Sequence, residues 1–210
     1  MTELARTRAF ETWLANANGA GLPQRPEEEL LAEHHIMLAV LGAMDAEGKE
    51  LLHGKPLRPD FWKGVVEFIG NFSHRIHRVK EERFFFPALE AWGLIEPEDC
   101  QRLEEDHRAL RDLTFLLCDG VNEGDWEKAF RVVAMYLGRV RLHLEAEEAG
   151  LLSVDLSEIG DERIAPMLES FAALERAEFI GTSRLHYVEI ADSLCRDVGL
   201  MPPSAEEATP

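Results

Sequence analysis

One pattern occurs twice in this chain and constrains its fold and chemistry more than any other feature. His77 and His143 are each followed four residues later by a glutamate, Glu81 and Glu147, then by a second glutamate and a pair of large apolar residues. In a helix, residues four apart lie on one face, so each histidine and its glutamate can reach a common metal ion. Two such helices facing each other would offer four ligands, with two carboxylates able to bridge a pair of ions.

The rest of the sequence predicts helices separated by short turns. Proline followed by acidic residues at Pro26 and Pro97 is typical of a helix start, because proline is tolerated at the first position and acids favour the positive end of the helix dipole. Gly124–Asp125 and Asp161 mark two further starts. The main helices are therefore expected over 26–48, 60–82, 97–120, 125–152 and 161–199.

Interruptions and ends are predicted from proline and glycine. Pro87 is expected to kink or end the second main helix and leave a turn through Trp92–Gly93, because proline lacks the N–H that continues a helix. The last helix is expected to be interrupted or kinked near Pro166 and Gly181. A short amphipathic helix is predicted over 3–17, and no segment carries a strand pattern.

These elements predict an all-α fold. Long helices with short connections favour an antiparallel four-helix bundle, here with a short N-terminal helix and extra C-terminal helices. The chain has 210 residues, of which 46% are hydrophobic, which is enough for one well-buried domain. We therefore expect a single domain over 1–210, with a core at about 27–198 and a loose tail at 200–210.

Charge and composition limit which binding partners and which cellular compartment we expect for this protein. The formal net charge of −18 disfavours nucleic acid and anionic membranes as partners. No apolar run approaches the ~18 residues of a membrane span, and the N-terminus lacks the pattern of a signal peptide. The three cysteines are odd in number and share no short spacing, so we expect reduced thiols and a cytoplasmic protein.

Four motifs, taken in chain order, carry a resemblance to a known family. They are Glu33–His34, the His77–Glu82 run leading into Phe86-Pro87-Ala88-Leu89, Asp106–His107 with Arg111, and the His143–Glu148 run. Together they resemble the hemerythrin-like family, also called the HHE cation-binding domain family. The resemblance covers residues from about 27 to 198 and extends to His186–Tyr187 in the last helix.

The resemblance implies a four-helix bundle around a non-haem di-iron centre bridged by two carboxylates. One metal would be served by His34 with His77, and the other by His107 with His143. The bridging carboxylates would be Glu81 and Glu147. Imidazole and carboxylate ligands suit two iron ions, with manganese or zinc as alternatives.

The chain departs from the oxygen-carrying hemerythrins at two positions. Those proteins have a further histidine where this chain has Arg111, and their second carboxylate is an aspartate five residues after its histidine. Here Glu147 and Glu148 stand four and five residues after His143, so both remain candidates. One fewer nitrogen ligand would leave an additional open coordination position, which favours reactivity over oxygen storage.

The sequence allows more than one role for several other polar residues. His74 is either a spare ligand, an outer partner or a hydrogen-bonded core histidine, and His186 could fill the position that Arg111 leaves vacant. Arg111 itself could pair with a bridging glutamate, meet an anionic ligand or form a surface salt bridge. His35 is expected to point about 100° away from His34 around the helix and not to be a ligand.

The leading functional hypothesis is a di-iron protein that binds or reduces a small oxidant: O2, peroxide or nitric oxide. Such a protein could be an oxidoreductase of a peroxidase-like, catalase-like or oxygen-activating kind. The alternative is a metal- or oxygen-sensing or iron-handling module that acts through a partner protein. A protein without a metal would bury four imidazoles and two carboxylates with no cation to compensate them, which would be energetically costly.

Overall fold

The computed structural model describes residues 9–13, 25–179 and 183–204, and all regular secondary structure within these ranges is helical. The predicted all-α class is therefore confirmed. Of the predicted helix over 3–17, residues 9–13 are helical and the others lie outside the described residues. Gly181 and most of the predicted tail also lie outside them. None of the helices in the described part of the chain combines the length and the apolar character of a membrane-spanning segment.

Four long helical segments form the main body. Three are regular α-helices: α2 (Pro26–Leu52), α6 (Pro97–Glu123) and α7 (Trp126–Ala149). The fourth is a continuous run over 59–91, which alternates between α- and π-helix: α3 (Pro59–Glu67), η2 (Phe68–His77), α4 (Arg78–Lys80), η3 (Glu81–Phe85) and α5 (Phe86–Ala91). The chain continues through the short 3-10 helix η4 (Leu151–Ser153) to α8 (Asp161–Glu178) and α9 (Arg184–Asp197).

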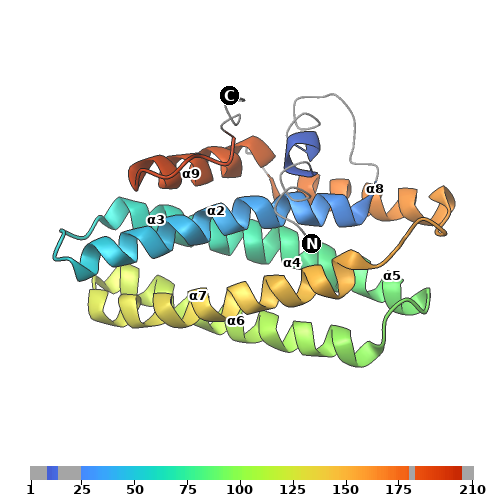
Figure 1. Cartoon of the computed structure of the whole chain (residues 1–210), viewed down its shortest axis with the longest axis horizontal. Coiled ribbons are helices and arrows are strands. Elements are labelled where there is room, and N and C mark those ends of the chain that lie inside the picture. The colour runs from blue at the N-terminus through green and yellow to red at the C-terminus, as the bar shows by residue number, and fades with distance from the viewer. Residues whose placement is uncertain (1–8, 14–24, 180–182, 205–210) are drawn as a thin grey trace.

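The four segments lie side by side along the long axis of the molecule (Figure 1). α6 packs along α7, α2 also contacts α7, and the 59–91 run contacts both α2 and α6. Helices α8 and α9 form a further layer: α9 packs on α2, and α8 contacts α2 and both π-helical parts of the 59–91 run. The C-terminal helices therefore cover one side of the bundle.

The helix starts follow the predicted signals. α2 and α6 begin at Pro26 and Pro97 with acidic residues in the first turn. α6 ends at Gly124, whose φ of 68° is the left-handed conformation that favours glycine, and the Asp125 side chain then accepts a hydrogen bond of 3.0 Å from the Lys128 backbone N–H to cap α7. α2 runs one turn longer than predicted and is followed by Gly54, with φ 82°.

The sequence predicts that Pro87 either kinks or ends its helix. The second outcome is wrong, because the helical run continues through Pro87 to Ala91. Pro87 follows η3 directly and lies in the first turn of α5. A π-helix shifts the hydrogen-bond register by one residue, so a new α segment begins at Phe86 and places the proline where a missing N–H costs little. The predicted turn at Trp92–Gly93 is confirmed, with φ 69° at the glycine.

Two apolar clusters fill the interior, and every long segment crosses them in a consistent way. On α2, Leu30 belongs to the smaller cluster and Ile36 to the larger one, with His34 between them. On the 59–91 run, Phe72 belongs to the larger cluster and Phe85 to the smaller.

Helices α6 and α7 repeat this arrangement. Leu103 and Leu110 on α6 lie in different clusters on either side of His107, and Leu144 and Leu151 belong to different clusters around Glu147. A buried polar layer therefore separates the two apolar clusters at one level of the bundle. That layer is where the sequence predicts the metal site.

The close approach of α6 to α7 gives a test of the packing. A Cβ at Gly120 would come within 3.0 Å of the Ala129 backbone nitrogen, whereas one at Gly138, on the exposed face of α7, would meet open space. We expect Gly138→Ala to stabilise the protein by about 1 kcal/mol, since alanine favours helix. Gly120→Ala should instead destabilise it by on the order of 1 kcal/mol, because the helices must separate. Urea unfolding of both variants measures this; equal stabilisation would contradict the packing described here.

Candidate metal centre

The structure brings all six residues predicted as ligands into the polar layer. They come from all four long segments and are nearly inaccessible to solvent, with exposed fractions between 0% and 4%. We refer to them as the central cluster: His34, His77, Glu81, His107, His143 and Glu147. Their donor atoms fall into two groups that could each hold a metal ion and that share Glu147.

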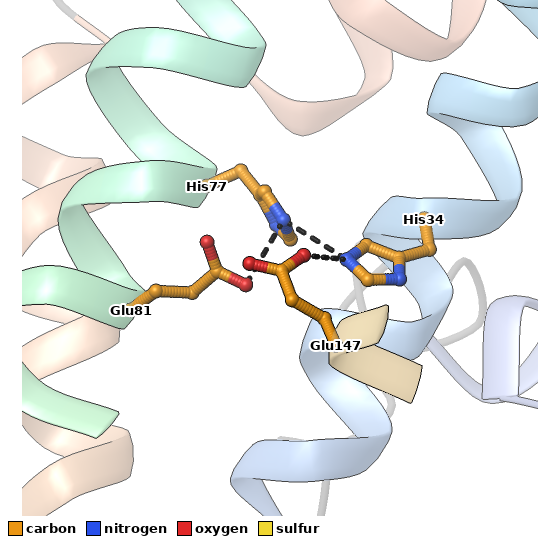
Figure 2. A group of neighbouring side chains, drawn as sticks. All are labelled: His34, His77, Glu81 and Glu147. Atoms are coloured by element: carbon orange, nitrogen blue, oxygen red, sulfur yellow. Dashed lines mark hydrogen bonds and ion pairs between the residues drawn. The ribbon is translucent and has the colours of Figure 1, made fainter. Parts of the chain in front are cut away.

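The first group joins α2, the 59–91 run and α7 (Figure 2). The Nε2 atoms of His34 and His77 are 3.1 Å apart. Glu81 Oε1 lies 3.3 Å from His77 Nε2, and Glu147 Oε2 lies 3.5 Å from His34 Nε2. Two imidazole nitrogens and two carboxylate oxygens therefore converge on one small volume.

The second group, His107, His143 and Glu147, lies beside the first and uses the other oxygen of Glu147, while the other oxygen of Glu81 also faces it. Glu81 Oε2 lies 3.4 Å from His107 Nε2. Glu147 Oε1 lies 3.4 Å from the same nitrogen and 3.0 Å from His143 Nε2. Each of the two carboxylates thus directs one oxygen toward each histidine pair, which is the disposition that a bridging carboxylate needs.

Outer carboxylates hold two of the imidazoles by their other nitrogen. His77 Nδ1 donates to Glu33 Oε2 at 2.8 Å, and His107 Nδ1 donates to Glu82 Oε1 at 2.9 Å. A histidine that donates from Nδ1 keeps the lone pair of Nε2 for a metal, and such partners fix both the tautomer and the ring orientation. The Nε2 atoms of both residues face the central cluster.

Of the remaining two histidines, only His34 has a carboxylate within hydrogen-bond distance of its outer nitrogen. His34 Nδ1 lies 3.2 Å from Glu148 Oε1, and His143 Nδ1 lies 4.0 Å from Asp106 Oδ2, which is beyond direct hydrogen-bond range. The position of Glu148 bears on the choice that the sequence left open. Because Glu148 holds the outer nitrogen of His34 while Glu147 faces both histidine pairs, Glu147 is the one placed to bridge.

Hydrogen bonding leaves the centre of the cluster unsatisfied. All four carboxylate oxygens of Glu81 and Glu147 are buried and have no hydrogen-bond partner among the described residues. Buried carboxylates without hydrogen bonds are costly unless a cation compensates them. The donor set of imidazole nitrogens and carboxylate oxygens is also one that iron, zinc or manganese accepts, so these residues fit a metal ion.

The electrostatics of the cluster favour positive charge. Burial lowers the pKa of His77, but the carboxylates of Glu81 and Glu33 outweigh it and raise that pKa to about 10. Burial raises the pKa of Glu147, but the imidazoles of His143, His107 and His34 hold it well below its usual range. The same field that favours a protonated imidazole would favour a metal cation.

Helix geometry contributes to the convergence. His77 is the last residue of η2 and Glu81 is the first residue of η3, so both π-helical stretches end or begin at a proposed ligand. π-helical turns inside α-helices occur often at functional sites, where the wider turn redirects a side chain. No sequence pattern indicates this feature, since the apolar spacing of the segment fits an ordinary helix.

The structure places His74 and His35 outside both groups of converging ligand atoms. His74 Nε2 donates to Thr114 Oγ1 at 2.9 Å, and burial, together with Arg78 and other nearby positive groups, lowers its pKa to about 4. His74 is thus a hydrogen-bonded, neutral imidazole. The ring of His35 stacks on Phe10 with centroids 4.8 Å apart.

His186 and Arg111 also lie apart from the central cluster. His186 Nε2 is 3.1 Å from Glu67 Oε1 at a partly exposed position of α9. The proposal that His186 fills a vacant ligand position is therefore not supported by its placement. Arg111 is exposed on α6 and contributes to the low pKa of His74.

A small cavity adjoins the central cluster and was not foreseen. It has a volume of about 20 Å³, and its wall includes the rings of His77, His107 and His143. Tyr136, which is 2% exposed, lines it and hydrogen-bonds Thr114. Tyr136 lies on the inward face of α7, two turns before His143, and this spacing could have indicated that it lines the site.

Neutralising the shared carboxylate tests the centre directly. Glu147→Gln should reduce the bound metal per chain by at least half, because an amide cannot supply a charged oxygen to each histidine pair. Glu145→Gln, two residues away on the exposed face of α7, should leave metal content unchanged. Elemental analysis of both purified variants gives the answer, and equal metal content would contradict a bridging role for Glu147.

Comparison with known proteins agrees with this geometry. The family model described as Hemerythrin HHE cation binding domain matches residues 25–154, which contain the whole central cluster. Searches of curated proteins and of solved structures gave no significant match. The family is one of cation-binding domains, and the chain has buried His and Glu groups able to hold a metal. The resemblance noted in the sequence is confirmed over residues 25–154, and the chain belongs to the hemerythrin HHE cation-binding family.

Proposed function

We propose that this protein holds two iron ions in the central cluster and uses them to bind or reduce a small oxidant. One ion would take His34 and His77, and the other His107 and His143. Glu81 and Glu147 would each give one oxygen to each ion. The observation that carries the proposal is the division of both carboxylates between the two histidine pairs at 3.0–3.5 Å.

The number of donors supports a reactive site. Two imidazoles and one oxygen from each carboxylate give each ion fewer donors than an octahedral iron accepts, so coordination positions would remain for an exogenous ligand. A bound iron pair would supply the electrons and the positive charge that an oxidant requires. The buried carboxylates would keep the two positively charged iron ions together in a part of the bundle that bulk water does not reach.

The cavity supports a small ligand. At about 20 Å³ it has room for about one to two water-sized molecules, which suits O2, peroxide or nitric oxide and excludes larger organic substrates. Met37, Leu110 and Val140 give it an apolar wall that limits water. His74 and Tyr136 line its polar side, and both hydrogen-bond the Thr114 hydroxyl behind them, which fixes the orientation of these two side chains.

The proposal is tested by iron content and absorbance of anaerobically purified protein. We expect two irons per chain, and ligand-to-metal charge-transfer absorption after O2, peroxide or nitric oxide is added. A long-lived spectrum would indicate carriage or sensing through a partner protein, whereas repeated consumption of the oxidant would indicate catalysis. If His77→Ala combined with His143→Ala retained as much iron as the unchanged protein, the proposal would be wrong.

Filling the cavity separates ligand access from metal binding. Leu110 is 4% exposed and lines the cavity, so Leu110→Phe should occupy much of its volume at a cost of about 1–3 kcal/mol in stability. We expect the variant to keep its iron but to react with the oxidant at least ~10-fold more slowly in stopped-flow absorbance. Leu110→Met, which nearly conserves volume, is the control. A Leu110→Phe variant that reacts as fast as the control would show that the cavity is not the ligand site.

A further inference from the structure

A buried cluster of charges lies next to the central cluster. Lys80 is fully buried, and its Nζ forms ion pairs with three carboxylates, those of Glu29, Glu33 and Glu175, the last at 2.5 Å. A buried ammonium group is tolerated only when charged partners replace its water. The three carboxylates converge closely enough to hold a cation, and the Lys80 ammonium group fills that role.

Arg184 closes this cluster from the C-terminal side. Its Nε donates to Glu175 Oε2 at 2.6 Å, and its Nη2 donates to Glu29 Oε1 at 2.8 Å. The guanidinium also lies over the Trp13 ring, 4.9 Å from the centroid. We call Lys80, Glu29, Glu33, Glu175 and Arg184 the Lys80 cluster. It contains three carboxylates and two cationic side chains in a nearly dry environment.

Glu33 connects the Lys80 cluster to the central cluster. Its Oε1 accepts a hydrogen bond from Lys80 Nζ, and its Oε2 accepts one of 2.8 Å from Nδ1 of His77. Glu33 is fully buried and has no contact with solvent through which to relax. Its position is therefore set by Lys80 on one side and by His77 on the other.

The Lys80 cluster also joins residues that lie within the family match to residues that lie beyond it. Glu29, Glu33 and Lys80 lie within the residues that the family model matches, which end at 154. Glu175 on α8 and Arg184 on α9 lie beyond that limit. The C-terminal helices thus supply an anion and a cation to a network that ends on a histidine of the central cluster.

We propose that α8 and α9 position the metal ligand His77 through the buried series Arg184–Glu175–Lys80–Glu33. Glu175 and Arg184 are positioning residues: they contact no metal ligand directly. The inference rests on the metal centre proposed above. If Glu175 loses its charge, Lys80 keeps only Glu29 and Glu33 as anionic partners, so it draws Glu33 toward itself and away from His77. The coupling is reciprocal, so metal bound at His77 stabilises the docking of α8 and α9.

The test compares Glu175→Gln with Glu169→Gln. Glu169 also lies on α8 and pairs with Arg176 at 2.6 Å, but both side chains of that pair are about two-thirds exposed. Fe²⁺ affinity is measured anaerobically by competition with a chelator, and the Co²⁺-loaded proteins are compared by their visible absorption bands. Glu33→Gln provides the reference for loss of the direct partner of His77.

We expect Glu33→Gln to weaken Fe²⁺ binding by ~10–100-fold, the range for partners of metal-bound histidines. Glu175→Gln should weaken it at least several-fold and shift the Co²⁺ bands, while Glu169→Gln should match the unchanged protein. A Glu175→Gln variant with lower thermal stability but unaltered Fe²⁺ affinity and Co²⁺ bands would overturn the inference, because the Lys80 cluster would then serve only to hold α8 and α9 in place.

Hydrogen exchange on the unchanged protein tests the reciprocal effect without any variant. Fe²⁺ loading should slow amide exchange in peptides from α8 (Asp161–Glu178) and α9 (Arg184–Asp197), as well as in the segments that carry the central cluster. Slower exchange at the central cluster alone would contradict the coupling. If the unchanged protein bound no Fe²⁺ at all, the proposed function would fail together with the inference, which distinguishes that outcome from the others.

Discussion

Two buried carboxylates face each other in the interior, and the rest of the structure depends on how their negative charge is compensated. Glu81 and Glu147 meet in the interior, both fully buried, with no hydrogen-bond partner for their oxygens among the described residues. Such a pair would repel and destabilise the fold unless positive charge lay between or beside it. The four surrounding imidazoles can supply that charge as protons, or a metal pair can supply it in their place. We therefore expect cation binding to stabilise the folded bundle.

The architecture around this pair serves to hold it at one level. Apolar clusters above and below the polar layer fix the register of the four long segments, and carboxylates behind the imidazoles fix the rings. The Lys80 cluster adds a second buried charge network, which balances its own charges while one member, Glu33, also binds His77. α8 and α9 thus take part in the electrostatics of the interior rather than only covering one side of the bundle.

How much of this structure the sequence predicts depends on whether each interaction is local in the chain or joins distant segments. The proline and acid signals predicted the helix starts at Pro26 and Pro97 because those signals are local. The four-residue spacing placed each His–Glu pair on one face for the same reason. In contrast, Glu33 reaches His77 on another segment, and Lys80 meets Glu175 on α8, so no local pattern reveals either contact. The π-helical stretches and the passage of helix through Pro87 likewise depend on tertiary packing.

Anomalous X-ray diffraction at the iron absorption edge, from crystals of anaerobically iron-loaded protein, is the decisive experiment for the proposed di-iron centre. We expect two iron ions per chain, one bonded to Nε2 of His34 and His77 and the other to Nε2 of His107 and His143. Glu81 and Glu147 would each be bonded to both ions. A single iron bound by one histidine pair, or iron located at any other set of residues, would show that the di-iron proposal is wrong.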